Sequence, residues 1–159
     1  MAGVSPVLAA YEFKQAFYTV AKELFKTSHP EFEIVRGLIG ANIPDEYMQV
    51  LGTSTDHEAA TMGSNRTREE TIQLETQWFI FRHGEVDADQ EAEDYLFARL
   101  GELEKHIRVN DITLGGVVRH CLLSTIATDS ARIENAGTSQ GRLAAAIAIW
   151  EAPIRIRNQ

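Results

Sequence analysis

Five histidines and a single cysteine are the side chains of this sequence best suited to nucleophilic or metal chemistry, and they are scattered along the chain. His57 and Glu58 are adjacent potential metal ligands, but no third ligand follows at a spacing typical of a metal site. Cys121 lies in an apolar segment without a second cysteine, which favours a small buried side chain over a ligand. The sequence therefore predicts no metal site, no cofactor and no catalytic residue.

Other catalytic patterns are also missing from the sequence. It contains no P-loop, no Gly-x-Ser-x-Gly elbow, no His-Glu-x-x-His helix and no Cys-x-x-Cys pair. Adjacent carboxylates such as Glu69 and Glu70 point to opposite faces of a strand, so they are poorly placed to share a proton. His83 and His120 could approach each other on neighbouring strands, and the sequence leaves this open.

Composition predicts one globular domain over residues 1–159. The chain is 44% hydrophobic and 24% charged, which is ordinary for a domain of this size with its own core. The N-terminus lacks the basic region of a signal peptide, and no apolar run approaches the length that spans a membrane. We therefore expect a soluble, intracellular protein.

The net charge of −8 is concentrated in one segment. Between Glu85 and Lys105 the chain carries eight acidic side chains against only two basic ones. A protein that grips phosphates needs a basic surface, and this segment has the opposite sign. The charge pattern predicts weak binding to DNA at physiological salt.

The stretch from Gly115 to Arg157 predicts one very long β-hairpin. Its first arm, Val117–Ile133, is rich in β-branched residues and contains neither proline nor glycine. Turn-forming residues follow at Asn135–Gly141, and a second, almost wholly apolar arm runs over Arg142–Glu151. Each arm exceeds the five or six residues of a common strand.

Both faces of the second arm are apolar. One face holds Leu143, Ala145, Ile147 and Ile149, and the other holds Ala144, Ala146, Ala148 and Trp150. A strand with one face in water should alternate between apolar and polar residues. Either a β-bulge switches the faces, or both faces are covered, and a neighbouring subunit is a natural cover.

The remaining elements predict an α+β fold. We expect a helix from Pro6 to about His29, a strand over Phe32–Ile39, a strand over Glu70–His83 and an acidic helix over Asp87–Ile107. The segment at 40–68 is short of apolar residues and is expected to be a long irregular loop. Together these elements give a mainly antiparallel sheet of about four strands, with two helices packed on one face and a long C-terminal β-hairpin.

The block from Ile72 to Arg157 resembles the tail terminator (tail-completion) proteins of long-tailed bacteriophages. The resemblance lies in an alternating strand that leads into the acidic helix at Asp87–Ile107, followed by Asp-Ile-Thr-Leu-Gly-Gly at 111–116 and a long strand. A turn and the closing strand Gly-Arg-Leu-Ala-Ala-Ala-Ile-Ala-Ile at 141–149 complete the block. The N-terminal helix and strand fit the same pattern.

The resemblance implies a structural virion protein and no enzyme. It implies a ring of identical subunits, commonly six, on the head-proximal end of the tail tube, assembled in the host cytoplasm. The implied partners are other copies of the chain, the major tail tube protein and a neck or head–tail connector protein, with genomic DNA passing through the lumen without specific binding. Two alternatives stay open: a neck or head–tail connector protein of the same virion, and a small α+β enzyme.

Seven residues are predicted to contact a subunit or partner: Arg66, Arg68, Asn135, Gly137, Gln140, Ile147 and Ile149. The two arginines belong to the expected loop and the next three to the expected hairpin tip, which projects from its own subunit. The two isoleucines lie on one of the two apolar faces of the hairpin, and the two helices can cover only one of these faces. Deletion of residues 135–140 is therefore expected to disturb assembly more than folding.

Overall fold

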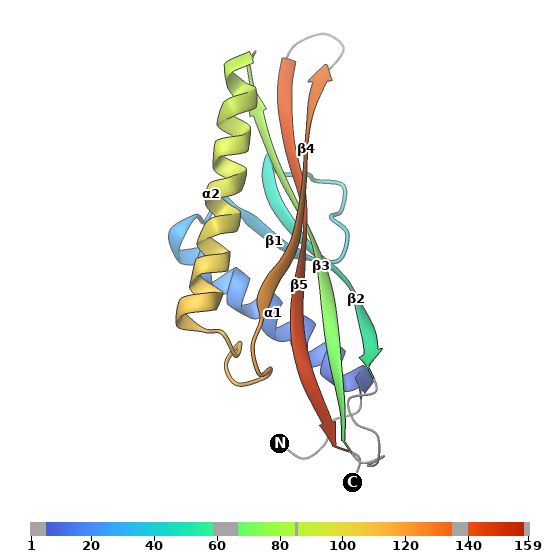
Figure 1. Cartoon of the computed structure of the whole chain (residues 1–159). Helices are drawn as coiled ribbons and strands as arrows, with labels where there is room; N and C mark the ends of the chain where they lie inside the picture. The colour runs from blue at the N-terminus through green and yellow to red at the C-terminus, as the bar shows by residue number, and fades with distance from the viewer. Residues whose placement is uncertain (1–5, 59–66, 85, 135–139, 158–159) are drawn as a thin grey trace.

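The chain folds into two helices packed on one face of a five-stranded sheet (Figure 1). This computed structural model describes residues 6–58, 67–84, 86–134 and 140–157. The elements are α1 (Pro6–Ser28), β1 (Glu33–Arg36), β2 (Glu46–Glu58), β3 (Thr67–His83), α2 (Val86–Asn110), β4 (Leu122–Glu134) and β5 (Gln140–Arg157). The α+β class and the C-terminal β-hairpin that the sequence predicts are confirmed, with one strand more than expected.

The strands follow the order β1-β2-β3-β5-β4, so the second arm of the hairpin lies inside the sheet and the first arm forms one edge. β3 and β5 pair over their full length, from Thr67 opposite Arg157 to His83 opposite Gly141. All strand pairs are antiparallel except the short pairing of β1 with β2. In Figure 1, α2 runs alongside the long strands and α1 crosses them obliquely.

The fifth strand corrects the irregular loop expected at 40–68. Residues Glu46–Glu58 form β2, which pairs with β3, while residues 59–66 lie outside the described residues. The register shifts between Val50 and Thr53, and Gly52, Thr53 and Ser54 are exposed. This half of the strand therefore lacks an apolar alternation, and the sequence does not mark it as a strand.

The first arm of the hairpin begins at Leu122, five residues later than the sequence predicts. Residues 112–119 form turns instead, and Gly115 and Gly116 adopt positive φ angles of 73° and 88°. Glycine takes this left-handed conformation without a steric penalty. The register of β4 against β5 shifts between Leu123 and Thr125, near the start of β4, whereas β5 pairs with β3 without a shift, so no bulge switches the faces of the second arm.

The core lies between the helices and one face of the sheet. α1 contributes Phe13, Phe17, Ala21 and Phe25; α2 contributes Ala92, Leu96, Leu103 and Ile107; β3 contributes Ile72, Leu74, Trp78 and Ile80; β5 contributes Ala144, Ala146, Ala148 and Trp150. The small alanines of β5 alternate with larger residues that face the other way, so the helices can approach this strand closely.

One threonine satisfies the polar groups of both buried tryptophans. The indole N–H groups of Trp78 and Trp150 donate to Thr76 Oγ1 at 2.9 and 3.2 Å. The Thr76 hydroxyl in turn donates to the carbonyl oxygen of Ala148 at 2.9 Å. Since an unpaired buried N–H group is costly, this arrangement allows two tryptophans to lie in the core.

Candidate assembly surface

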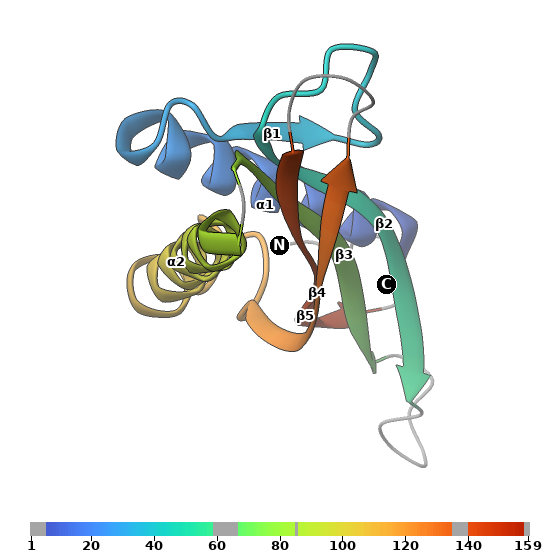
Figure 2. The ribbon, with the colours of Figure 1, turned by 90° about the horizontal axis from the view of Figure 1, so that it is seen from above.

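The two faces of the sheet differ in what covers them. Both helices lie on the same face, as Figure 2 shows from above, and neither helix covers the opposite face. The segment at 37–45 lies over part of that opposite face, where the Ile39 N–H donates to Oε1 of the buried Gln49 at 2.8 Å. Along β5, Ala146 and Ala148 are buried beneath the helices, whereas Ile147 between them is 40% exposed. The apolar pattern of this strand therefore leaves one row of side chains on an open face.

An apolar patch occupies the end of this open face at which β5 begins. We define the sheet patch as Tyr47, Phe79, Phe81, Leu143, Ala145 and Ile147, which come from β2, β3 and β5 and lie in adjacent register positions. The rings of Tyr47 and Phe79 stack with centroids 4.9 Å apart. Partial burial raises the pKa of the Tyr47 phenol above its ordinary value.

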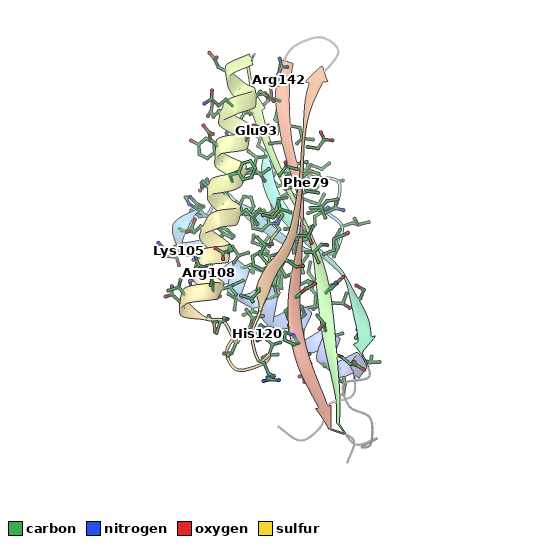
Figure 3. All side chains as sticks on the ribbon, in the orientation of Figure 1. Phe79, Glu93, Lys105, Arg108, His120 and Arg142 are labelled. Atoms are coloured by element: carbon green, nitrogen blue, oxygen red, sulfur yellow. The ribbon has the colours of Figure 1, made fainter. Side chains whose placement is uncertain are left out.

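A groove runs through the sheet patch toward the edge strand. It has a volume of about 260 Å³, and its walls come from Phe79 in β3, Ala145 and Ile147 in β5, and Ala127 and Asp129 in β4. Figure 3 shows Phe79 pointing away from the side of the sheet that carries the helices. Gln77 and Thr128 also line the groove, so its walls combine apolar side chains with a few polar groups, and it is suited to receive a side chain of another protein.

Polar side chains predominate on the rest of the open face. Gln73, Glu75 and Glu151 lie farther from the start of β5, and Gln73 Nε2 donates to Glu151 Oε1 at 3.0 Å. Two apolar side chains interrupt them, because Ile149 lies opposite Glu75 and Leu122 lies opposite Glu151. The continuous apolar surface is therefore confined to the end of the sheet that holds the sheet patch.

Only two of the seven predicted contact residues have side chains that the structure describes. Ile147 and Ile149 lie on the open face, as expected from their alternation along β5. Gln140 begins β5 and Arg68 belongs to β3 and not to a loop, which corrects its expected setting, while their side chains lie outside the described part. Arg66, Asn135 and Gly137 also lie outside the described residues.

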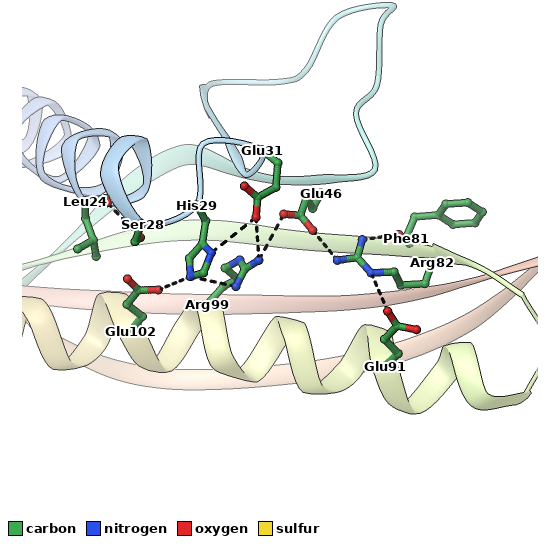
Figure 4. Close-up of polar contacts among 10 residues, drawn as sticks. All are labelled: Leu24, Ser28, His29, Glu31, Glu46, Phe81, Arg82, Glu91, Arg99 and Glu102. Atoms are coloured by element: carbon green, nitrogen blue, oxygen red, sulfur yellow. Dashed lines mark hydrogen bonds and ion pairs between the residues drawn. The ribbon is translucent and has the colours of Figure 1, made fainter.

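An ionic network that the sequence does not reveal lies at the margin of the core (Figure 4). Its members are His29 and Glu31 after α1, Glu46 at the start of β2, Arg82 near the end of β3, and Glu91, Arg99 and Glu102 on α2. Arg82 Nη2 donates to Glu46 Oε2 at 2.8 Å, and Arg99 Nη2 donates to Glu31 Oε1 at 3.2 Å. Arg99 also lies 3.6 Å from the second oxygen of Glu46.

The centre of this network is desolvated. The side chains of Arg99 and Glu46 are only 6% and 5% exposed. The ring of Tyr95 lies 4.4 Å from the guanidinium carbon of Arg82 and 5.4 Å from that of Arg99, so it contacts both cations. Because opposite charges from α2, β2 and β3 meet here, the network fixes α2 against the ends of two strands.

The sequence holds one usable sign of this network. Arg99 follows Leu96 by three residues and precedes Leu103 by four, so it falls on the buried stripe of an otherwise acidic helix. A buried arginine requires anionic partners. Its partners Glu31 and Glu46 are more than 50 residues away in the sequence, however, and only the packing of α2 on the sheet identifies them.

The histidines do not come together at one place. His83 ends β3 opposite Gly141, whereas His120 precedes β4, whose first residue pairs with Glu151 near the other end of β5. The approach of His83 and His120 that the sequence left open therefore does not occur. Among the described residues, no group of three or more His, Cys, Asp or Glu side chains is placed to hold a metal ion.

Cys121 is expected to be chemically inert in the folded chain. It is fully buried, and burial raises the pKa of its thiol from 9.0 to about 12. Since the thiolate is the reactive form, Ellman's reagent at about pH 8 should label Cys121 only after unfolding in guanidinium chloride. The raised pKa contributes stability that is complete below about pH 9 and is lost as the pH rises toward 12. Rapid labelling of the native protein would contradict this prediction.

Comparison with models of known protein families gives no match, and a search of curated proteins gives none either. Neither helix in the described part of the chain is both long and apolar enough to cross a membrane. Function has to be inferred from the sheet patch, the groove and the charge distribution of the chain itself.

Proposed function

We propose that this chain is a structural virion protein, a tail terminator of a long-tailed bacteriophage. In this proposal a ring of identical subunits, commonly six, caps the head-proximal end of the tail tube. The ring stops polymerisation of the tube and joins the tail to the neck. The observation that carries the proposal is the sheet patch, which neither helix covers.

The composition of the sheet patch supports a protein partner. Three aromatic side chains, Tyr47, Phe79 and Phe81, lie together on an open sheet face with the aliphatic side chains of β5. Aromatic residues are enriched at the centres of protein interfaces, and contiguous exposed apolar patches mark such sites on soluble proteins. In the assembled ring, each subunit would bury the sheet patch against its neighbour or against the end of the tube. The free chain leaves this apolar surface in contact with water.

The charge of the chain supports the passage of genomic DNA without retention. The helix α2 carries the exposed acidic residues Asp87, Glu91, Glu93 and Asp94, and the whole chain has a net charge of −8. Phosphate contacts by Lys and Arg supply most of non-specific DNA binding, and this excess of carboxylates opposes it.

The proposal is tested by polymerising the major tail tube protein of the same virus with and without this chain. We expect tubes of limited length in its presence, with a ring at one end in negative-stain electron micrographs, and open-ended growth in its absence. Tubes of unchanged length without end rings would contradict the proposal. Binding to the portal-side connector, with no effect on tubes, would instead assign the chain to the neck.

A further inference from the structure

The sheet has two unpaired edges, one on each side. β4 pairs with β5 on one side and with no described strand on the other. On the far side of the sheet, β1 pairs only with Tyr47–Val50 of β2. No described strand therefore pairs with the outer edge of Leu51–Glu58, the second half of β2 (Figure 1).

Each edge strand has one irregularity near an end of the unpaired stretch, between Val50 and Thr53 in β2 and between Leu123 and Thr125 in β4, but both edges lack other features that prevent pairing with another chain. Proteins commonly guard edge strands with proline, lysine or an inward-pointing charge. The sequences of β4 and of Leu51–Glu58 contain neither proline nor lysine. β4 also exposes two large apolar side chains, Leu122 at 41% and Ile126 at 44%. An edge of this kind is suited to accept a further strand.

The directions of the two edges are complementary. β3 and β4 both run antiparallel to β5, and β2 runs antiparallel to β3, so β4 and β2 have opposite directions. A second copy placed beside the first in the same orientation brings its β2 antiparallel to β4. We propose that the chain associates head-to-tail through this contact, in which β4 of one copy pairs with Leu51–Glu58 of the next.

Side chains on the helix-bearing face support this partner. Ile126 is paired with the buried Ala148, so its side chain lies on the face that carries the helices, where it is nevertheless 44% exposed. On the opposite edge, α1 begins beside β2 on the same face (Figures 1 and 2), with Val7 79% and Tyr11 55% exposed. Head-to-tail pairing places Ile126 of one copy toward Val7 and Tyr11 of the next.

A two-fold pairing of β4 with β4 fits these observations less well. It would leave Leu51–Glu58 and the start of α1 exposed in both copies. A head-to-tail contact uses both edges of every copy, and when its rotation closes, no free edge remains. The inference deepens the proposed ring and rests on it, because a closed ring is what repetition of this contact is expected to give.

The test is disulfide trapping between copies. Ser54 lies on the open face, since it pairs with Gln73, and Thr125, Ala127 and Asp129 of β4 lie on the same face. The Ser54→Cys variant is mixed in turn with the Thr125→Cys, Ala127→Cys and Asp129→Cys variants, and each mixture is oxidised. The three mixtures sample three strand registers that differ by two residues. Native Cys121 does not interfere, because it is buried. Mixtures are oxidised both in concentrated solution and on tube protein.

At least one mixture is expected to give a disulfide-linked band at twice the chain mass that neither variant gives alone, since directly opposed residues of paired strands meet disulfide geometry. A chain carrying both cysteines of that mixture should give a ladder that ends at the ring size. A dimer from Ala127→Cys alone, or no cross-link in any mixture under either condition, overturns the inference. Cross-linking without any effect on tube length would instead retain the edge contact and refute the terminator function.

Discussion

Replacing Ile147 by aspartate is expected to abolish tube capping while the subunit stays folded. Ile147 is 40% exposed on the open face and lines the groove of the sheet patch with Phe79 and Ala127. In the free chain an aspartate here stays hydrated, so the fold should lose only about 1–2 kcal/mol from reduced apolar burial and strand propensity. When the patch is covered by a partner, the carboxylate is left buried without a cation beside Asp129, which costs several kcal/mol at every contact.

The adjacent residue provides a matched control. Ala148 lies on the same strand but faces the helices and is fully buried. Ala148→Asp should therefore unfold the chain or shift its melting temperature strongly, because the charge enters the core itself. Thermal melting and tube-length measurements on both variants separate the two effects. If Ile147→Asp caps tubes as the native chain does, the sheet patch is not an assembly surface; if it unfolds like Ala148→Asp, Ile147 belongs to the core.

Replacement of Arg99 by methionine is expected to have the largest effect on stability among changes outside the apolar core. Methionine keeps much of the volume of the aliphatic stem but removes the cation that lies between Glu31 and Glu46. Arg82 remains 2.8 Å from Glu46, so the buried carboxylate loses one of its two cations, at a cost of about 2 kcal/mol. For a chain of this size the melting temperature should fall by roughly 4–8 °C.

Two further variants show whether the cost arises from the contact between Arg99 and Glu46. Arg108→Met removes an exposed arginine of the same helix that pairs with Glu104, and its melting temperature should match that of the native chain. Glu46→Gln alone and combined with Arg99→Met completes a double-mutant cycle, and the double variant should lose less stability than the sum of the two single variants, because each single change already removes the contact between Arg99 and Glu46. A melting temperature for Arg99→Met within about a degree of the native value would show that the network contributes little.

Periodicity in the sequence predicts the helices and strands that have one solvent-exposed face and one buried face. The alternation of β3 and the helical stripes of α1 and α2 predict these elements with ends close to those observed. The same counting predicts that Ile147 and Ala148 face opposite ways. It fails for Leu51–Glu58, because Gly52, Thr53 and Ser54 are exposed and this part of β2 has no apolar alternation to detect.

The sequence by itself determined the α+β class, the long hairpin and the excess of apolar residues on both faces of its second arm, because these follow from local spacing of side chains. Only the tertiary structure decided which of the two apolar faces stays open, since that depends on where both helices pack. It also decided that Arg82 and Arg99 meet Glu31 and Glu46, and that the outer edges of β4 and β2 are left unpaired. Such contacts join residues distant in the chain, so no local pattern can specify them.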